Sequence, residues 1–549
     1  MDAHNLYSRE EAKFNPRIAY SPRVYVTPNR QFLLKYMILT LVLLLSSCMV
    51  GPNYVPPKLV VPPQFKEAQD KKVIEVTRKN WKPIKPQDDI ERGEWWKIFN
   101  DPVLNALEDQ LYHYNQNIVQ AEANFSQSLA IVDQARSSLY PTLVGAVSTF
   151  RQRQAGGSAS IISASGGTAG TATTNITPRA ATTSIYTGFL NANWEPDIWG
   201  AVRRNIEANL SLAESNEALI GVIRLSAQGA LAQYYFELRA LDRSQKYLDE
   251  TVIAYQKLLQ FTRNQYASGV ASRADVVQIQ IQLESAKASA INNGILRGQY
   301  EHAIAVLMGR PPAYFSLKPA VVRLKPPPIP LQVPSVWLER RPDIAQAERL
   351  VQQASALIGV AIAAYFPTLS LTGTSSLAGN SLHELFHQPV FSWSAGMQLA
   401  ETIFDGGFRK AGVRIAKEQY IAQVANYRQV VLTAFQDVED NLISLRLLEQ
   451  QSIVQDKAAA DALYVLKLTK NQYKAGTVPY SNILTAQISA LAAEQTAVQV
   501  DGLQMASAVG LIKSLGGGWV VNVTIPPKVK NTKSSVPGKQ SVIYGDTTQ

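Results

Sequence analysis

The segment from His383 to His387 has the residue types and the spacing of a zinc hydrolase site. A helix would place the two histidines on one face as zinc ligands, with Glu384 as a general base. Two features argue against this chemistry. Pro389 would end a helix two residues after His387, and the candidate third ligand, Glu401, falls at the end of a predicted strand. We therefore interpret the match as accidental and predict no metal site, with a surface metalloprotease as the alternative.

No other enzymatic signature stands out in the 549 residues. The sequence has no G-x-x-x-x-G-K-[ST] phosphate loop, so we do not expect nucleotide hydrolysis. The Gly-rich stretch 156–170 has no helix start directly after it and is better interpreted as a loop. A single cysteine rules out an internal disulfide framework and a cysteine-based zinc site. The sequence thus predicts no catalytic residue, no cofactor and no enzyme activity.

The one cysteine, Cys48, ends a segment with the pattern of a bacterial lipoprotein signal. Basic residues precede the apolar run 37–45, which is too short to span a bilayer as a helix. The sequence Leu45-Ser46-Ser47-Cys48 looks like a lipobox, in which the cysteine carries the lipid and becomes the mature N-terminus. The alternative is a buried free cysteine after an unrelated apolar run. We predict a covalent lipid on Cys48, which would anchor the chain in a membrane.

The composition limits the partners that the chain can have. Charged residues make up 17% of the sequence, below the roughly 25% of typical soluble domains. Of the net charge of +10, the segments 1–47 and 524–549 each contribute three positive charges, which leaves +4 for the rest. Because nucleic-acid binding requires a clustered basic face, we predict no nucleic-acid partner.

An internal repeat organises most of the chain. Residues 262–269 (TRNQYASG) match residues 469–476 (TKNQYKAG) at an offset of 207. Further upstream, residues 140–143 match residues 366–369 at an offset of 226. An insertion at 155–180, rich in Ser, Thr and Gly, explains the longer offset and has the composition of a loop. The sequence therefore predicts a tandem duplication rather than several unrelated domains.

The two halves have the same predicted order of elements: a helix, two strands, a very long helix, a turn and a return helix. The long helices have about 67 residues, or about 100 Å at 1.5 Å per residue. In the first half, the first helix and the return helix would together match the long helix in length. The expected helices are Pro102–Ser138, Ala201–Ala267 and Ser272–Met308, then Asp343–Ala364, Gly407–Lys474 and Tyr480–Leu515.

Four strands are expected, and they cannot close a barrel by themselves. Each has about 9–11 residues, the length that crosses a bilayer as a tilted strand. Because lipid does not tolerate open strand edges, other copies of the chain must complete the sheet. Three copies give twelve strands, whereas a dimer's eight would enclose an interior filled by side chains. The expected strands are Thr142–Arg151, Ser184–Trp194, Thr368–Ala378 and Phe391–Leu399.

These patterns divide the chain into six predicted segments. They are the N-terminal extension and signal peptide (1–47), an anchor segment (48–101), the first repeat (102–320), a Pro-rich linker (321–342), the second repeat (343–520) and a C-terminal tail expected to be disordered (521–549).

The order and spacing of several short motifs resemble the outer membrane factor family, the TolC-like efflux and secretion ducts. The resemblance covers about residues 48–520 and is strongest to the lipoprotein (NodT-type) branch that serves resistance–nodulation–division pumps. The motifs are Gly51-Pro52-Asn53-Tyr54, Glu94-Trp95-Trp96, Trp194-Glu195-Pro196-Asp197-Ile198-Trp199-Gly200, Glu339-Arg340-Arg341-Pro342-Asp343-Ile344, Tyr365-Phe366-Pro367-Thr368-Leu369 and Ile403-Phe404-Asp405-Gly406-Gly407.

This resemblance implies an α+β membrane protein that forms a homotrimer. Its 12-stranded β-barrel would cross the outer membrane and continue into a 12-helix α-barrel in the periplasm. The family's ducts are passive exits that dock at their periplasmic tips to an adaptor (membrane fusion) protein and a resistance–nodulation–division transporter of the inner membrane. Met49 is not the aspartate associated with inner-membrane retention, so the analogy favours the outer membrane.

The resemblance also places a gate and an adaptor-docking site at the two helix turns, which contain Gly269 and Gly476. Two alternatives stay open there, because Asp275 would also suit a helix cap and the two tyrosines would also suit packing between helices. The family's acidic ring is absent from the second half. The candidate gate residues are Tyr266, Arg273, Asp275 and Gln278 in the first half, and Tyr473, Asn482 and Thr485 in the second.

The sequence thus predicts a lipid-anchored exit duct for small toxic compounds, with most of the chain in the periplasm. A type I secretion duct is the alternative within the class, and a periplasmic helical scaffold without a pore is the alternative outside it. The motifs do not identify the transported compounds.

Overall fold

A computed structural model describes residues 49–59, 62, 65–67, 94–154, 181–327, 341–387 and 389–517. Cys48, the predicted signal segment, the insertion at 155–180, most of the predicted linker and the tail lie outside the described residues. From Val50 onward the chain forms one compact unit, and the description below concerns this unit.

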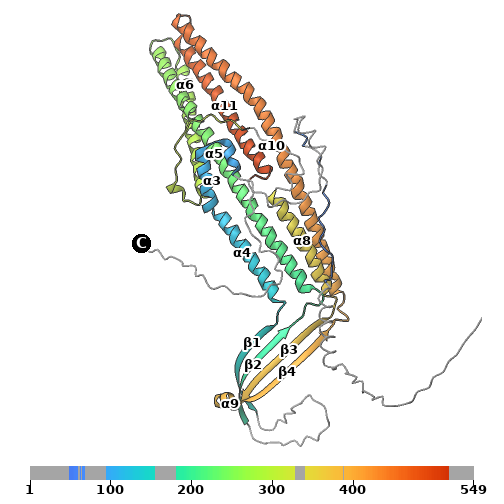
Figure 1. Cartoon of the computed structure of the whole chain (residues 1–549). Helices are drawn as coiled ribbons and strands as arrows, with labels where there is room; N and C mark the ends of the chain where they lie inside the picture. The colour runs from blue at the N-terminus through green and yellow to red at the C-terminus, as the bar shows by residue number, and fades with distance from the viewer. Residues whose placement is uncertain are drawn as a thin grey trace, which may run out of the picture. The chain divides into compact units, whose positions relative to one another are not determined.

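Two helices of 67 residues dominate the fold, α5 (Ala201–Ala267) and α10 (Phe408–Lys474). Each is followed by a return helix of 35 residues, α6 (Arg273–Leu307) and α11 (Tyr480–Ser514) (Figure 1). All four predicted helices are therefore confirmed to within about one residue at each end. None of the helices in the described part of the chain is long and apolar enough to cross a bilayer.

The single helix predicted over Pro102–Ser138 is wrong, because the structure has two helices there. They are α3 (Pro102–Tyr114) and α4 (Gln116–Ser137), and Asn115 stands between them with an extended backbone (φ −68°, ψ 119°). The Asn115 side chain accepts hydrogen bonds from the backbone N–H groups of Asn117 and Ile118, so it caps α4. It also donates to the Leu307 carbonyl oxygen at 2.7 Å, which ties this break to the end of α6.

The second half has no such break in its first helix, α8 (Pro342–Ala363). Two short 3-10 helices are also present, η1 (Trp95–Phe99) and η2 (Pro312–Tyr314). Helices α4 and α6 both pack along α5, and α8 and α11 both pack along α10. Helices α8 and α11 also contact α5, so the two halves share one helical layer.

Four antiparallel strands form one sheet in the order β1-β2-β3-β4. The predicted strands are all present and extend at one or both ends. A short helix, α9 (Leu382–His387), joins the last two strands. The outer edges of β1 and β4 have no strand partner within the described residues. The strands are β1 (Thr142–Gln154), β2 (Ala181–Trp194), β3 (Thr368–Gly379) and β4 (Val390–Ala400).

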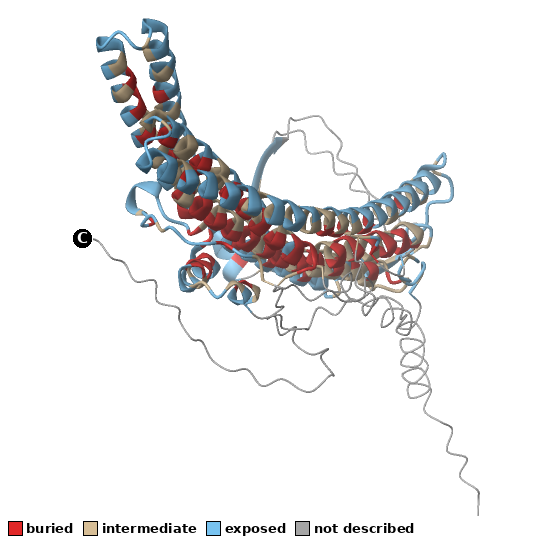
Figure 2. Ribbon diagram, turned by 90° about the horizontal axis from the view of Figure 1, so that it is seen from above, coloured by how far each residue is buried: buried red, intermediate tan, exposed pale blue. Residues whose placement is uncertain are grey.

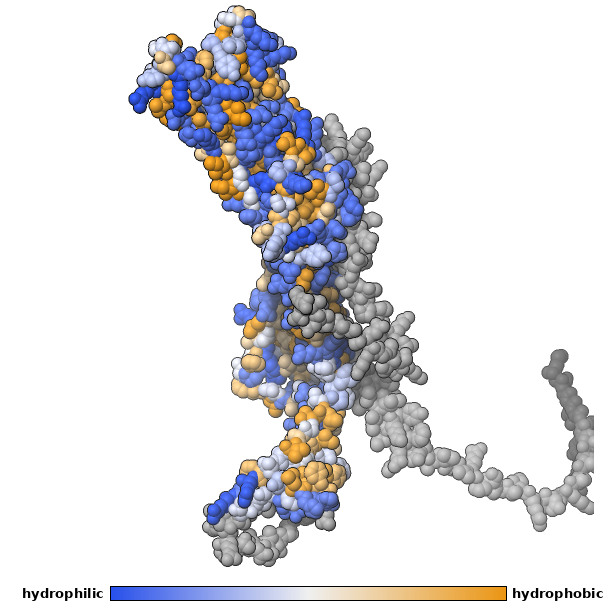
Figure 3. Space-filling model, turned by 90° about the vertical axis from the view of Figure 1, so that its left-hand side faces the viewer, coloured by the Kyte–Doolittle hydropathy of each residue, from blue (hydrophilic) through white to orange (hydrophobic). Residues whose placement is uncertain are grey.

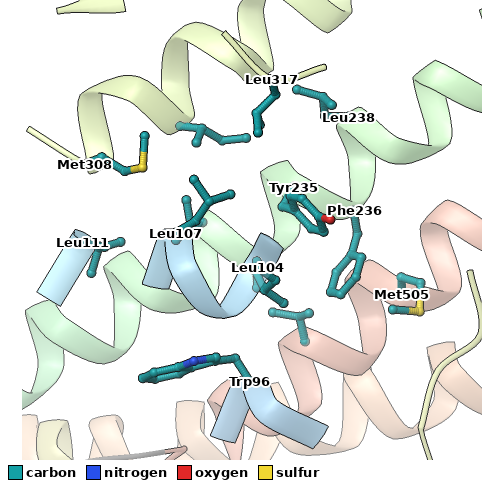
Figure 4. Packing of buried hydrophobic residues seen from close by; sticks show 14 of the residues in the cluster. Trp96, Leu104, Leu107, Leu111, Tyr235, Phe236, Leu238, Met308, Leu317 and Met505 are labelled. Atoms are coloured by element: carbon teal, nitrogen blue, oxygen red, sulfur yellow. The ribbon is translucent and has the colours of Figure 1, made fainter. Parts of the chain in front are cut away.

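The largest buried cluster lies in the middle of the helical layer, and its side chains come from both halves of the chain. Leu104 and Leu107 of α3 pack there with Tyr235 and Phe236 of α5 and with Met505 of α11 (Figure 4). Each large apolar side chain that is fully buried contributes about 1.5–3 kcal/mol. The buried residues lie mainly where the helices face one another (Figure 2), and many of those on α5 are alanines, whose small side chains allow close helix packing.

Candidate functional site: a two-faced sheet and a helical tip

The strand register sorts the sheet residues onto two chemically different faces. Residues opposite each other on neighbouring strands share a face, and alternate residues along a strand do not. One face carries mainly large apolar side chains, among them Leu143, Val147, Leu190, Leu371, Leu377, Phe391, Trp393 and Met397. The other face carries mainly hydroxyl and amide side chains with some apolar ones, and its polar members include Asn191, Asn193, Thr372, Thr374, Ser376, Ser392, Ser394 and Gln398.

Side-chain hydrogen bonds link neighbouring strands on the polar face. The Thr374 hydroxyl donates to Asn191 Oδ1 at 3.3 Å, and the hydroxyls of Ser376 and Ser392 lie 2.7 Å apart. Within the four strands the only charged residues are Arg151 and Arg153, which lie near the end of β1 and belong by register to the apolar face. The polar face is therefore water-compatible and uncharged.

The apolar face is exposed although its side chains are large. Val147, Trp393 and Met397 are 75%, 72% and 75% exposed, and hydrophobic residues gather on the visible face of the sheet near the helices (Figure 3). An exposed apolar face of this kind requires a partner or lipid to cover it. A wall with one lipid-compatible face and one wet face is the arrangement of a transmembrane barrel around a polar interior.

The residues of the zinc-like motif lie on α9, where Glu384 stabilises the start of the helix. The Glu384 carboxylate accepts a hydrogen bond from the Asn380 N–H at 2.8 Å, and the Ser381 hydroxyl accepts one from the Glu384 N–H. Glu401 follows the far end of β4, roughly 30 Å from α9 at about 3.3 Å per strand residue. Among the described residues, no group of three potential ligands could hold a metal. Helix capping thus accounts for Glu384, and the rings of His383 and His387 lie 4.2 Å apart.

The two helix turns at the other end of the molecule have the same backbone geometry. Gly269 and Gly476 have positive φ angles of 76° and 72°. The N–H groups of Gly269 and Val270 donate to the carbonyl oxygens of Tyr266 and Gln265, which is the Schellman arrangement, and Gly476 repeats it. No atom lies within 4 Å of a Cβ built on either glycine, so the backbone conformation alone selects glycine.

Asp275 is part of a capping box at the start of α6. Its carboxylate accepts a hydrogen bond from the Ser272 N–H at 2.8 Å, and its own N–H donates to the Ser272 hydroxyl. The hydrogen bonds that the carboxylate accepts from the Ser272 N–H and from the Ser272 hydroxyl lower the pKa of the Asp275 carboxyl. Within the described residues, Arg273 forms no ion pair with it. The structure thus confirms the capping alternative for Asp275, and the gate role stays a prediction.

The other candidate gate residues lie on the surface of the single chain. Tyr266 is 48% exposed and Tyr473 is 44% exposed, so neither is buried by packing within the chain. The Tyr473 ring lies 5.5 Å from the Tyr480 ring, and the Tyr480 ring lies 6.0 Å from Phe261. The exposed residues also include Gln278, Asn482 and Thr485, and the Thr485 hydroxyl donates to the Ser481 carbonyl oxygen.

Tyr480 and Phe261 were not among the predicted tip residues. Their ring contact joins α5 of the first half to α11 of the second, so the two helix turns belong to one structural end of the unit. The one sequence signal for Tyr480 is its position at the start of the return helix. Nothing in the sequence pairs it with a residue more than 200 positions away.

A second feature that the sequence did not indicate holds the segment just after Cys48. The buried Arg204 side chain donates to the carbonyl oxygens of Val50 and Gly51 and to Asn53 Oδ1, at 3.2, 3.3 and 2.9 Å. Its other nitrogen contacts Glu207 at 2.7 Å. Arg204 lies in the first turn of α5, which begins soon after β2 ends. The segment is therefore fixed where the sheet meets the helices.

Arg341, just before α8, links the start of that helix to the middle of α10 and the end of α11. It forms ion pairs with Asp343 at 2.7 Å and Asp437 at 3.2 Å, and it donates to the Ser514 carbonyl oxygen at the end of α11. Arg341 lines a polar cavity of about 430 Å³. Lys513 also lines it, so two cations, Arg341 and Lys513, stand with two carboxylates, Asp343 and Asp437, and the charges of the lining balance.

Comparisons with known proteins agree with this geometry. A family profile described as "Outer membrane efflux protein" matches residues 107–310 and 333–517. The chain is 28% identical over 480 residues to the probable efflux pump outer membrane protein TtgC of Pseudomonas putida, covering 87% of this chain and 94% of that protein. It is 25% identical over 480 residues to the cation efflux system protein CusC of Escherichia coli, covering 87% and 97%. The solved structure of the outer-membrane channel OprN is similar in fold, with a TM-score of 0.70 at 24% identity, covering 86% of this chain and all of that one.

Proposed function

The chain belongs to the outer membrane efflux protein family, and on that premise we propose that it is the outer-membrane exit duct of a tripartite efflux pump. The observation that carries this proposal is the two-faced sheet. Its exposed apolar face fits lipid, and its uncharged polar face fits a water-filled passage. Proteins of this family work with a periplasmic adaptor and an inner-membrane transporter, and we assign this chain the same two partners.

We further propose that three copies of the chain assemble into the duct. Among the described residues, the outer edges of β1 and β4 have no partner strand, and such edges require one in lipid. Three four-stranded sheets give the twelve strands of a closed barrel. Each chain also supplies two long helices and two composite columns, α4 with α6 and α8 with α11, for a twelve-column helical barrel. The equal lengths of α5 and α10, and of α6 and α11, support a tandem duplication.

A lipid on Cys48 would hold the chain at the outer membrane. Cys48 is joined to Val50 by two peptide units, a reach of about 7 Å. Arg204 fixes Val50 beside the start of α5, close in the chain to the end of β2. A lipid there would enter the membrane at the level where the sheet begins.

We assign the periplasmic gate and the adaptor contact to the tip turns around Gly269 and Gly476. Tyr266 and Tyr473 are exposed in the single chain and are available to narrow a passage between copies. Arg273, Gln278, Asn482 and Thr485 are exposed at the same end, and Asp275 would contribute there in addition to its capping role. Because the transporter of such a pump selects the cargo, we propose small toxic compounds as the substrate class, carried by a resistance–nodulation–division transporter.

Single-channel recording tests the duct. Purified full-length protein, lipidated and in detergent, is added to a planar bilayer after its mass confirms a trimer. Discrete conductance steps are expected. A stable trimer that gives no steps at any voltage would refute the duct and favour a scaffold without a pore. Metabolic labelling with palmitate, in the wild type and in Cys48→Ala, tests the lipid separately.

A further inference from the structure

An unbalanced set of positive charges lies at the tip of the helical layer. We define the tip as residues 257–285 and 465–493, the two helix turns with the helix ends on either side. It carries six cationic side chains, all of them exposed, and none forms an ion pair or a hydrogen bond within the described residues. They are Lys257, Arg263, Arg273, Lys467, Lys470 and Lys474.

The tip has only two acidic residues, and both already have partners. The Asp275 carboxylate accepts hydrogen bonds from Ser272 in the capping box. Glu284 forms an ion pair with Lys287 at 3.0 Å. The second helix turn has no acidic residue between positions 465 and 493. The tip therefore has a net charge of +4 in each chain.

The six cations belong to one surface rather than two. The ring contact between Phe261 of α5 and Tyr480 of α11 holds the two turns together, and both turns lie at the same end of the helices (Figure 1). Lys467, Lys470 and Lys474 are spaced three and four residues apart, so they follow one face of α10. In an assembly of three copies this surface would repeat around the axis.

No opposing charge is available further along the proposed passage through the sheet. The polar face of the four strands consists of Ser, Thr, Asn and Gln with a few apolar side chains, and it contains no carboxylate and no amine. Arg151 and Arg153, near the end of β1, belong by register to the other face. The charge at the tip is therefore not cancelled by the sheet.

We propose that the tip cations make the periplasmic entrance selective for anions. The inference rests on the proposed duct and adds the charge class of the solutes that enter it most readily. Clusters of like charge create surface potentials of several kT. A positive potential of one kT per elementary charge raises the local concentration of a monovalent anion by a factor of e and lowers that of a monovalent cation by the same factor. The anion is therefore enriched over the cation about sevenfold. The effect extends about 10 Å at 0.1 M salt and about 3 Å at 1 M.

Reversal potentials in planar bilayers test this proposal with the full-length trimer and a KCl gradient centred on 0.1 M. We expect chloride to be several times as permeant as potassium, with the ratio falling toward one in gradients centred on 1 M. The triple variant Lys467→Gln, Lys470→Gln, Lys474→Gln should lower the ratio at 0.1 M at least twofold. The matched control removes three exposed cations from the opposite end of α10: Lys410→Gln, Arg414→Gln and Lys417→Gln.

Each result has a separate meaning. Channels that prefer potassium, or whose selectivity does not change with salt, overturn the inference and leave the duct intact. An equal effect of the control triple overturns the assignment to the tip. Trimers without currents overturn the duct and the inference with it. If the triple variant does not assemble, the salt dependence of the wild-type protein still decides the question.

Discussion

Replacing Arg204 with alanine tests whether the segment after Cys48 is held by this one side chain. In the wild type the Arg204 side chain is only 2% exposed. Its guanidinium donates hydrogen bonds to two backbone carbonyl oxygens and to the Asn53 side chain, and it forms an ion pair with Glu207. Removing one partner from a buried charged network costs about 3–5 kcal/mol. The Val50 N–H bonds to the Trp199 carbonyl oxygen at 3.1 Å and reports directly on the segment.

Hydrogen–deuterium exchange of the peptide around Val50 measures this cost. If the segment opens locally, a loss of about 3 kcal/mol accelerates exchange roughly 100-fold, because each 1.4 kcal/mol is a factor of ten. Arg204→Lys keeps the charge but not the forked geometry, and it should give an intermediate rate. Arg136→Ala breaks only an exposed pair with Asp133 and serves as the control, with a change under about 0.5 kcal/mol. Unchanged protection in Arg204→Ala would show that other contacts hold the segment.

Three further perturbations follow from the structure. Burial raises the pKa of the Glu108 carboxyl, whose oxygens have no hydrogen-bond partner among the described residues. The stability that the protonated carboxyl gives at low pH is therefore lost as the pH rises. Glu108→Leu should raise the stability of the proposed trimer at pH 7 by about 1–3 kcal/mol and flatten its pH dependence, and a melting temperature at or below the wild-type value would contradict this. Gly476→Ala places a Cβ on a residue with φ +72° and should destabilise the tip by about 1–2 kcal/mol without a steric clash. Hydrogen–deuterium exchange of residues 470–480 measures this loss, and exchange at the wild-type rate would show that the alanine causes no strain. Trp393→Arg on the apolar face should cost the proposed barrel about 2–4 kcal/mol of stability in lipid, whereas Thr374→Arg on the polar face should be tolerated. Heat dissociation of the proposed trimers compares the two variants, and equal losses would mean that the faces are wrongly assigned.

The sequence alone determined the features that a few neighbouring residues encode. The lengths of α5, α6, α10 and α11 were predictable because glycine in a left-handed conformation ends a helix locally, as Gly269 and Gly476 do. The four strands were predictable from their lengths and alternation. The order and spacing of the short motifs indicated the family. The capping role of Asp275 was an open alternative because its signal, Ser272 three residues earlier, is equally local.

Only the tertiary structure decided which distant residues meet. The helix break at Asn115 involves a hydrogen bond to the Leu307 carbonyl oxygen. The position of the segment after Cys48 depends on Arg204, which lies about 150 residues away in the sequence from the backbone that it binds. The residues on each face of the sheet could be assigned only once the pairing register of the strands was known, because shifting a strand by one residue moves its side chains to the opposite face. A single sequence records the residue types at such contacts but not the pairing, since pairing is set by how the whole backbone packs.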